Sequence, residues 1–259
     1  MNDKRDYTEQ NRRAWDEIAK IREKTLFPPA TFFAEGGSIL DAVVTQAVGE
    51  VAGKTLLHLQ CASGEETLSW AVMGATATGV DISEAQIKLA RRKAKAAGLK
   101  VQFIAADVYA LPDAVQSATF DLVYTGGGAL PWLPDLHGWA QAVTATLNAG
   151  GRFVLYEEHP LAGCLWVADG KIRVDYDYFM RSTPDYSTTW AHFLGGERAK
   201  ETKVEFQWPL GDVVTALARA GLRIERLEEF PSTADWRFGE KLDAVGWLPG
   251  QYLLIAEKR

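Results

Sequence analysis

The stretch TLLHLQCASGEETLSWAVMGATATGVDIS, residues 55–83, decides the fold. Its apolar run Leu56–Leu59 predicts a buried strand, and the small residues that follow predict a tight turn. Thr67–Met73 is typical of a helix, and the β-branched run Thr76–Val80 predicts a second strand that ends on an acidic residue. Two parallel strands need a crossover helix between them, and ligands bind beyond the carboxyl ends of such strands. The stretch therefore predicts a ligand site at these two tips.

The residues at the two tips indicate which ligand is expected. Asp81 at the second tip could accept both hydroxyls of a ribose in charge-assisted hydrogen bonds. A dinucleotide site would show G-x-G-x-x-G before the helix, but here only Gly64 remains, with Gln60 and Ala62 at expected glycine positions. The acidic pair Glu65–Glu66 opens the helix and would repel a phosphate. S-adenosylmethionine has an adenosine, no phosphate and two cationic groups, so the sequence favours it over NAD.

The chain resembles the class I S-adenosylmethionine-dependent methyltransferases. More narrowly, it resembles a bacterial group whose first motif reads LLHLQC..G.(D/E)TLSWA..GA.VTGVD.S. The likeness extends over most of the chain through five further motifs, in this order: NRRAWDEIA, DVYALP, FDLVYTGGGALPWLPDL, GGRFVLYEEHP and LARAGLRIERLEEFP. The resemblance implies a methyl transfer that leaves S-adenosylhomocysteine, and a last strand antiparallel to the rest. It implies no particular metabolite.

Alternating strand and helix patterns predict an α/β fold, a Rossmann-like, doubly wound, seven-stranded and mostly parallel sheet with an inserted aromatic-rich β segment. The expected strands are Thr55–Leu59, Thr76–Val80, Val101–Ala105, Thr119–Tyr124, Gly151–Tyr156, Leu222–Phe230 and Tyr252–Glu257. The expected helices are Tyr7–Ile21, Ile39–Val51, Glu65–Met73, Glu84–Ala97, Leu136–Leu147 and Leu210–Ala220, with Ser83 and Asp135 as N-caps and Gly98 as a C-cap. Four regions are expected: N-terminal helices over the cofactor site (1–51), the cofactor-binding core (52–160), a substrate-side insertion (161–208) and the C-terminal part of the core sheet (209–259).

The composition of the chain limits the classes of partner that it is expected to bind. The chain has 259 residues and a net charge of −6, which argues against the basic face that nucleic-acid binding needs. No apolar run reaches the roughly 20 residues of a membrane span, and the first residues lack the apolar core of a signal peptide. Cys61 and Cys164 show no metal-ligand spacing. We expect a cytoplasmic monomer or homodimer that binds a small-molecule methyl acceptor, with no metal, nucleic acid or membrane.

The resemblance assigns the adenine contacts. It implies that Asp107, at the tip of the third strand, accepts the exocyclic amine, whereas a simpler interpretation is a turn residue that holds Tyr109. Ile82 and Val108 would sandwich the ring, and Gln86 lies on the helix face nearest the adenosine. For the ribose contact at the second tip, the alternative is a helix cap, a role that Ser83 already fills.

The turn below the cofactor's methionine part has five members, Gln60, Cys61, Ala62, Ser63 and Gly64. Most related enzymes have glycine at positions 60 and 62. Because a side chain makes a positive φ costly, Gln60 is expected to avoid it. Cys61 is expected to be a small packing residue. His58, where relatives carry an acid, is interpreted as a core histidine hydrogen-bonded to the loop.

Other contacts to the methionine part are expected from the fourth strand tip and the first helix. Backbone groups of Thr125 and Gly126 would meet the ammonium, and Trp132 would form a wall beside them. Trp15 and Tyr7 could cover the sulfonium, since aromatic faces attract cations by about 0.5–2 kcal/mol. Alternatively, Trp15 only docks its helix on the core.

The tip of the fifth strand, EEHP, is the expected acceptor side. His159 has a suitable intrinsic pKa for a general base, and Glu158 could orient it or bind a substrate amine. The alternative is a Glu–His pair that stabilises the loop, and His192 is a second candidate base. The chain departs from the resembling group at Pro209, where relatives often have histidine.

The predicted function is transfer of a methyl group from S-adenosylmethionine to O, N or C of a small, planar or hydrophobic molecule. In-line alignment of donor and acceptor would supply much of the catalysis. Nine tryptophans favour an aromatic acceptor pocket. The alternative is an S-adenosylmethionine-binding protein without transferase activity. A third option, methylation of RNA or protein, would need a basic or extended groove.

Overall fold

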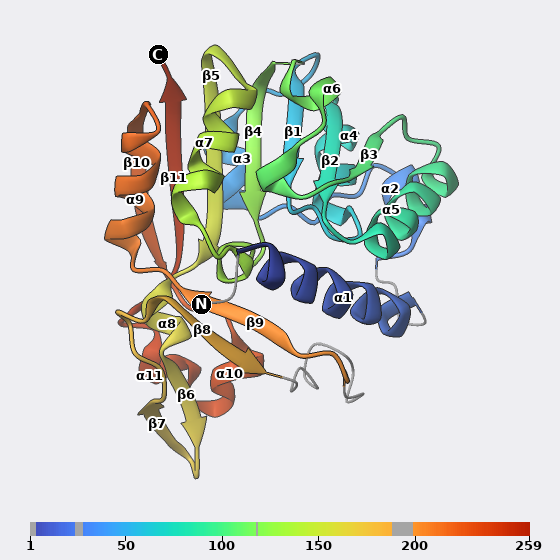
Figure 1. Ribbon diagram of the computed structural model, residues 1–259. Helices are drawn as coiled ribbons and strands as arrows, with labels where there is room; N and C mark the ends of the chain where they lie inside the picture. The colour runs from blue at the N-terminus through green and yellow to red at the C-terminus, as the bar shows by residue number, and fades with distance from the viewer. Residues whose placement is uncertain (1–3, 24–27, 118, 188–198) are drawn as a thin grey trace.

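The computed structural model describes residues 4–23, 28–117, 119–187 and 199–259 (Figure 1). A seven-stranded sheet runs in the order β10-β11-β5-β4-β1-β2-β3. The bounds of these strands are β1 Thr55–Leu59, β2 Thr76–Asp81, β3 Gln102–Ala105, β4 Phe120–Gly126, β5 Leu147–Glu158, β10 Leu222–Pro231 and β11 Pro249–Lys258. Strands β1 to β5 are parallel, whereas β11 is antiparallel to both of its neighbours. The predicted fold class and the reversed last strand are confirmed.

Helices cover both faces of the sheet, so the parallel strands are buried on both sides as their continuous apolar runs require. On one face Leu57 and Leu59 share a core with Trp139 of α7. On the other face Leu56 packs with Trp70 of α4. The bounds of the helices are α1 Lys4–Arg22, α2 Ala30–Ala34, α3 Ala42–Val48, α4 Glu65–Val72, α5 Glu84–Ala97, α6 Asp113–Gln116, α7 Leu136–Thr146, α8 Pro160–Gly163, α9 Leu210–Arg219, α10 Asp235–Phe238 and α11 Leu242–Val245, with the 3-10 turns η2 Val108–Ala110, η3 Leu130–Trp132 and η4 Gly239–Lys241.

The predicted elements match closely around the decisive stretch. Strand β1 and helix α5 have the expected bounds, and Ser83 caps α5 by accepting a hydrogen bond from Gln86 N. Asp135 is the N-cap residue of α7, as predicted, and its side chain pairs with Lys4. The short helix α2 is not predicted, and α3 is shorter than the expected Ile39–Val51.

The aromatic-rich insertion forms two antiparallel hairpins. They are β6 Leu165–Ala168 with β7 Lys171–Val174, and β8 Arg181–Ser187 with β9 Lys203–Gln207. Figure 1 shows both hairpins on the side of the sheet where the parallel strands end. Short antiparallel strands in this region are confirmed, while the expected region boundaries stay predictions.

Helix α1 crosses beneath the carboxyl ends of the strands (Figure 1). Side-chain hydrogen bonds of Asp16 and Asn11 hold it in place. Asp16 Oδ1 accepts hydrogen bonds from Ser83 Oγ at 2.6 Å and Ala85 N at 3.1 Å. Asn11 exchanges two backbone hydrogen bonds of 2.8 Å with Val204 of β9. The same helix therefore ties the core sheet to the insertion and closes the space between them.

Candidate active site

A cavity of about 1250 Å³ lies at the carboxyl edge of the sheet, between the strand tips, α1 and the insertion. Residues from five strand tips line it: Gln60, Ala62, Asp81, Ile82, Ala106, Asp107, Val108, Gly126, Tyr156, Glu157 and Glu158. From α1 and the insertion come Asn11, Trp15, Trp166, Tyr176, Met180, Asp185, Glu205, Phe206 and Gln207. Pockets for one drug-sized ligand measure about 300–1,000 Å³, so this cavity has room for two molecules.

The second and third strand tips bring together two of the predicted carboxylates. Asp81 accepts hydrogen bonds from Ala62 N at 2.8 Å and from Ser83 N at 2.9 Å. Burial raises the pKa of Asp81 to about 6, although both N–H donors oppose that shift. Asp107 lines the same cavity while its Oδ1 accepts Tyr109 N at 2.9 Å, so it holds the turn as well.

The turn after β1 has an unexpected backbone conformation. Gln60 has φ of 56° and Ala62 has φ of 45°, so the expectation that position 60 avoids positive φ is wrong. Tertiary hydrogen bonds hold the turn, because Cys61 N donates to Val80 O at 2.9 Å and Ala62 N donates to Asp81. These bonds to β2 offset the steric cost of two left-handed residues.

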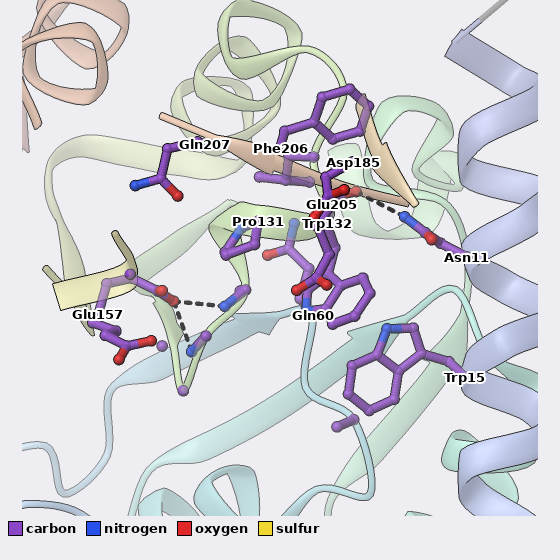
Figure 2. A pocket seen from close by; sticks show the side chains of 18 of the residues that line it. Asn11, Trp15, Gln60, Pro131, Trp132, Glu157, Asp185, Glu205, Phe206 and Gln207 are labelled. Carbon is purple, nitrogen blue, oxygen red and sulfur yellow. Dashed lines mark hydrogen bonds between the residues drawn. The ribbon is translucent and has the colours of Figure 1, made fainter. Parts of the chain in front are cut away.

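The side chain of Gln60 points into the cavity (Figure 2). Its Oε1 accepts a hydrogen bond from Thr125 at 3.4 Å. Its Nε2 is buried without a hydrogen-bond partner among the described residues. A buried donor without a partner carries a desolvation cost that a ligand oxygen would remove.

Besides Tyr7, which is described with Trp15, five residues predicted to touch the cofactor do not line the cavity: Cys61, Ser63, Gly64, Gln86 and Thr125. Cys61 packs in the core below the turn, and burial raises its thiol pKa, as suits a packing residue. Ser63 donates to the Glu65 carboxylate at 2.9 Å. Gln86 is buried, with its side-chain nitrogen unpartnered in the described part of the chain. If these residues contact the cofactor as predicted, the contacts would have to come from their backbone groups or follow a rearrangement of the turn after β1.

The two aromatic residues predicted on α1 have different positions. Trp15 lines the cavity and packs edge-on against Trp132 with ring centroids 5.0 Å apart, so it both docks the helix and faces the ligand space. Tyr7 is outside this cavity and packs edge-on against Phe206 at 5.5 Å. The structure thus does not support a sulfonium contact for Tyr7.

His58 is a core residue, as predicted, but its partner is a helix and not the loop. Its Nδ1 lies 2.8 Å from Thr67 Oγ1 in the first turn of α4. Burial lowers the pKa of His58 to about 3, so the ring is neutral at physiological pH.

The predicted pairing of Glu158 with His159 is wrong. His159 lies outside the cavity lining, with Nε2 2.9 Å from Glu229 Oε1 and Nδ1 accepting Leu161 N at 3.1 Å. Glu158 does line the cavity, but its partner is Arg237 at 3.2 Å. Both ring nitrogens of His159 are engaged away from the acceptor space, and the predicted base role has no geometric support. The other candidate base, His192, lies outside the described residues.

Glu157, the first residue of the EEHP tip, is a site residue that was not predicted from the sequence. Its side chain is 3% exposed and lines the cavity. Its Oε1 accepts backbone hydrogen bonds from Gly128 at 3.1 Å and Ala129 at 2.7 Å. Burial, reinforced by neighbouring carboxylates, raises its pKa to about 8. Two acidic residues at a strand tip could have indicated this buried carboxylate. The adjacent His159 was predicted as the base instead, because its intrinsic pKa suits that role.

Comparison with known proteins identifies a domain within the chain. Residues 56–151 match the family described as "Methyltransferase domain". A solved S-adenosylmethionine-dependent methyltransferase from Mesorhizobium loti is 26% identical, with a TM-score of 0.62 over 83% of this chain and 96% of that one. Residues 56–151 are thus a methyltransferase domain, and the chain as a whole is similar in fold to a solved S-adenosylmethionine-dependent methyltransferase.

Among curated methyltransferases, the chain is similar to two that are named for quinones. It is 33% identical over 108 residues to a ubiquinone biosynthesis O-methyltransferase of Bordetella pertussis, covering 42% of this chain and 44% of that protein. It is 29% identical over 144 residues to a demethylmenaquinone methyltransferase of Clavibacter sepedonicus, covering 55% and 56%. The chain spans about half the length of these relatives.

The residues that line the cavity fit S-adenosylmethionine. Carboxylates stand at successive strand tips, apolar Ile82 and Val108 lie beside them, and the orphaned Gln60 Nε2 faces the same space. No helix in the described ranges is long and apolar enough to cross a bilayer.

Proposed function

We propose that the protein transfers a methyl group from S-adenosylmethionine to a small, planar or hydrophobic acceptor held between α1 and the insertion. Bound S-adenosylmethionine would supply an electrophilic methyl group. Asp81 would hold the ribose and Asp107 the adenine, while Gln60 would face the methionine part. The observation that carries this proposal is one cavity that joins both carboxylate tips to an aromatic-lined space.

The acceptor half of the cavity supports a ring-shaped molecule. Trp132, Tyr176 and Phe206 line it, and flat aromatic walls bury planar molecules well. Two similar proteins are named for quinone methylation, which agrees with a ring acceptor. These aromatic side chains would mainly serve to align the acceptor ring with the methyl group of the cofactor.

The experiment that tests this function has two steps. Calorimetry with S-adenosylmethionine is expected to show binding, whereas NADH binding without it would contradict the proposal. Release of S-adenosylhomocysteine is then measured with catechols, hydroquinones and aromatic amines. Binding without turnover on any of them would favour the alternative, a cofactor-binding protein without transferase activity.

Cofactor affinity is expected to depend on pH through Asp81. Its pKa of about 6 in the free protein means that the carboxyl becomes protonated below pH 6, and only the carboxylate accepts two ribose hydroxyls. Affinity for S-adenosylhomocysteine should therefore be about tenfold weaker at pH 5 than at pH 7.5. Calorimetry at both pH values checks this, with Asp81→Asn as the variant that should lose the pH dependence. Equal affinity at both pH values in the native protein would contradict it.

A further inference from the structure

Glu157 sits where the turn after β4 meets the tip of β5. Figure 2 shows both backbone hydrogen bonds reaching the same carboxylate oxygen, Oε1, from Gly128 and Ala129. The second oxygen, Oε2, has no hydrogen-bond partner in the part of the chain that the structure describes, although the side chain lines the cavity. The two amides thus fix the orientation of the carboxyl and leave Oε2 as the position for a proton.

Among the described residues, no cation is paired with Glu157, because Arg237, which lines the same cavity, pairs with Glu158. The titratable groups that face it are Glu66 of α4, Glu158 of β5, Tyr124 of β4 and Tyr252 of β11. A buried carboxylate without a cation is costly, so the free protein holds this group mostly protonated at pH 7. A cation brought into the cavity would reverse that preference, because opposite charges attract strongly in a buried site.

We infer that Glu157 loses its proton when S-adenosylmethionine binds and then takes the proton that the methyl acceptor gives up. This inference rests on the proposed function. The acceptor's O–H proton passes to Oε2 while the O–CH₃ bond forms and the S–CH₃ bond breaks. The negative charge on the carboxylate and the positive charge on sulfur disappear together. The net charge of the pair formed by Glu157 and the cofactor's sulfur is therefore zero before and after transfer, which a buried cavity favours.

The other acid–base groups at this tip are less suited to the role. Glu158 is paired with Arg237, and His159 is held by Glu229 and a backbone amide outside the cavity. Glu158 also lines the cavity and has an unpartnered Oε1, but its ion pair with Arg237 opposes the rise in its pKa that burial causes. Glu157 is the more buried of the two, and its backbone hydrogen bonds leave Oε2 for a proton.

Calorimetry tests the inference without any acceptor. Binding of S-adenosylmethionine and of S-adenosylhomocysteine is measured at pH 7 in two buffers with different ionisation enthalpies. The two compounds differ by the sulfonium methyl, so their difference in proton release reports a group that senses this charge. We expect the native protein to release up to one additional proton with S-adenosylmethionine, and Glu157→Gln to abolish that difference while Oε1 still accepts both amides.

Glu229→Gln is the matched control, because it removes a carboxylate that lies outside the cavity lining and should keep the proton release. With catechol as acceptor, Glu157→Gln should lower turnover about 100- to 10,000-fold and leave S-adenosylhomocysteine affinity within about twofold. Equal proton release by the native protein and Glu157→Gln, or native turnover by that variant, would overturn the inference. Failure of the native protein to bind S-adenosylmethionine would instead overturn the proposed function itself.

Discussion

Asp81→Ala is expected to weaken binding of S-adenosylhomocysteine by about 2–4 kcal/mol, or roughly 30- to 1,000-fold. The variant removes the carboxylate proposed to accept the ribose hydroxyls. It also removes the acceptor of Ala62 N and Ser83 N, two bonds that position the turns on either side of the ligand. Calorimetry at pH 7.5 measures the loss, and Glu84→Ala, an exposed carboxylate at the start of α5, should bind like the native protein.

A ribose contact can be separated from a loop effect with the 2′-deoxy analogue of S-adenosylhomocysteine. If Asp81 binds the ribose, the analogue binds the native protein weakly and the Asp81→Ala variant loses little more. The two changes are then strongly non-additive, as expected for groups in contact. Additive losses would mean that Asp81 acts only through the turns, and the ribose assignment would be abandoned.

The strand tips could be predicted from sequence because their positions follow from local patterns. An apolar run ending at a polar residue marks a tip, and alternation of strands with helices places all the tips on one edge. Asp81 and Asp107 are 26 positions apart in the sequence, yet both were predicted at one edge of the sheet, and both line one cavity in the structure. The same patterns gave α5 its bounds and its cap.

The orientation of a side chain beyond a strand tip depends on contacts with residues far away in the sequence. Local sequence patterns do not reveal these contacts. The partner of His159, Glu229, lies on β10 and is 70 residues away in sequence. Likewise, the positive φ of Gln60 is held by hydrogen bonds from the following turn residues to β2, against its local preference. In both cases a tertiary contact overrides the local expectation.

Gly64→Ala is expected to destabilise the protein by about 2–4 kcal/mol, from the left-handed conformation and from overpacking. Gly64 has φ of 81° at the start of α4. An added Cβ would lie 2.7 Å from the Phe103 ring and 2.9 Å from Ala90 Cβ, both in a buried cluster. Thermal unfolding should show the midpoint lowered by roughly 5–15 °C.

Ala62→Gly is the matched control in the same turn. Ala62 has φ of 45°. Glycine adopts this positive φ without steric cost, but it also increases the conformational entropy of the unfolded chain. The net change in the free energy of unfolding should therefore stay within about 1 kcal/mol. The backbone N–H at position 62 still donates to Asp81, which keeps the turn joined to β2. A native unfolding midpoint for Gly64→Ala, or a large loss for Ala62→Gly, would show that the turn does not have this left-handed geometry. The close packing of Gly64 against Phe103 would then no longer explain the conformation of the turn after β1.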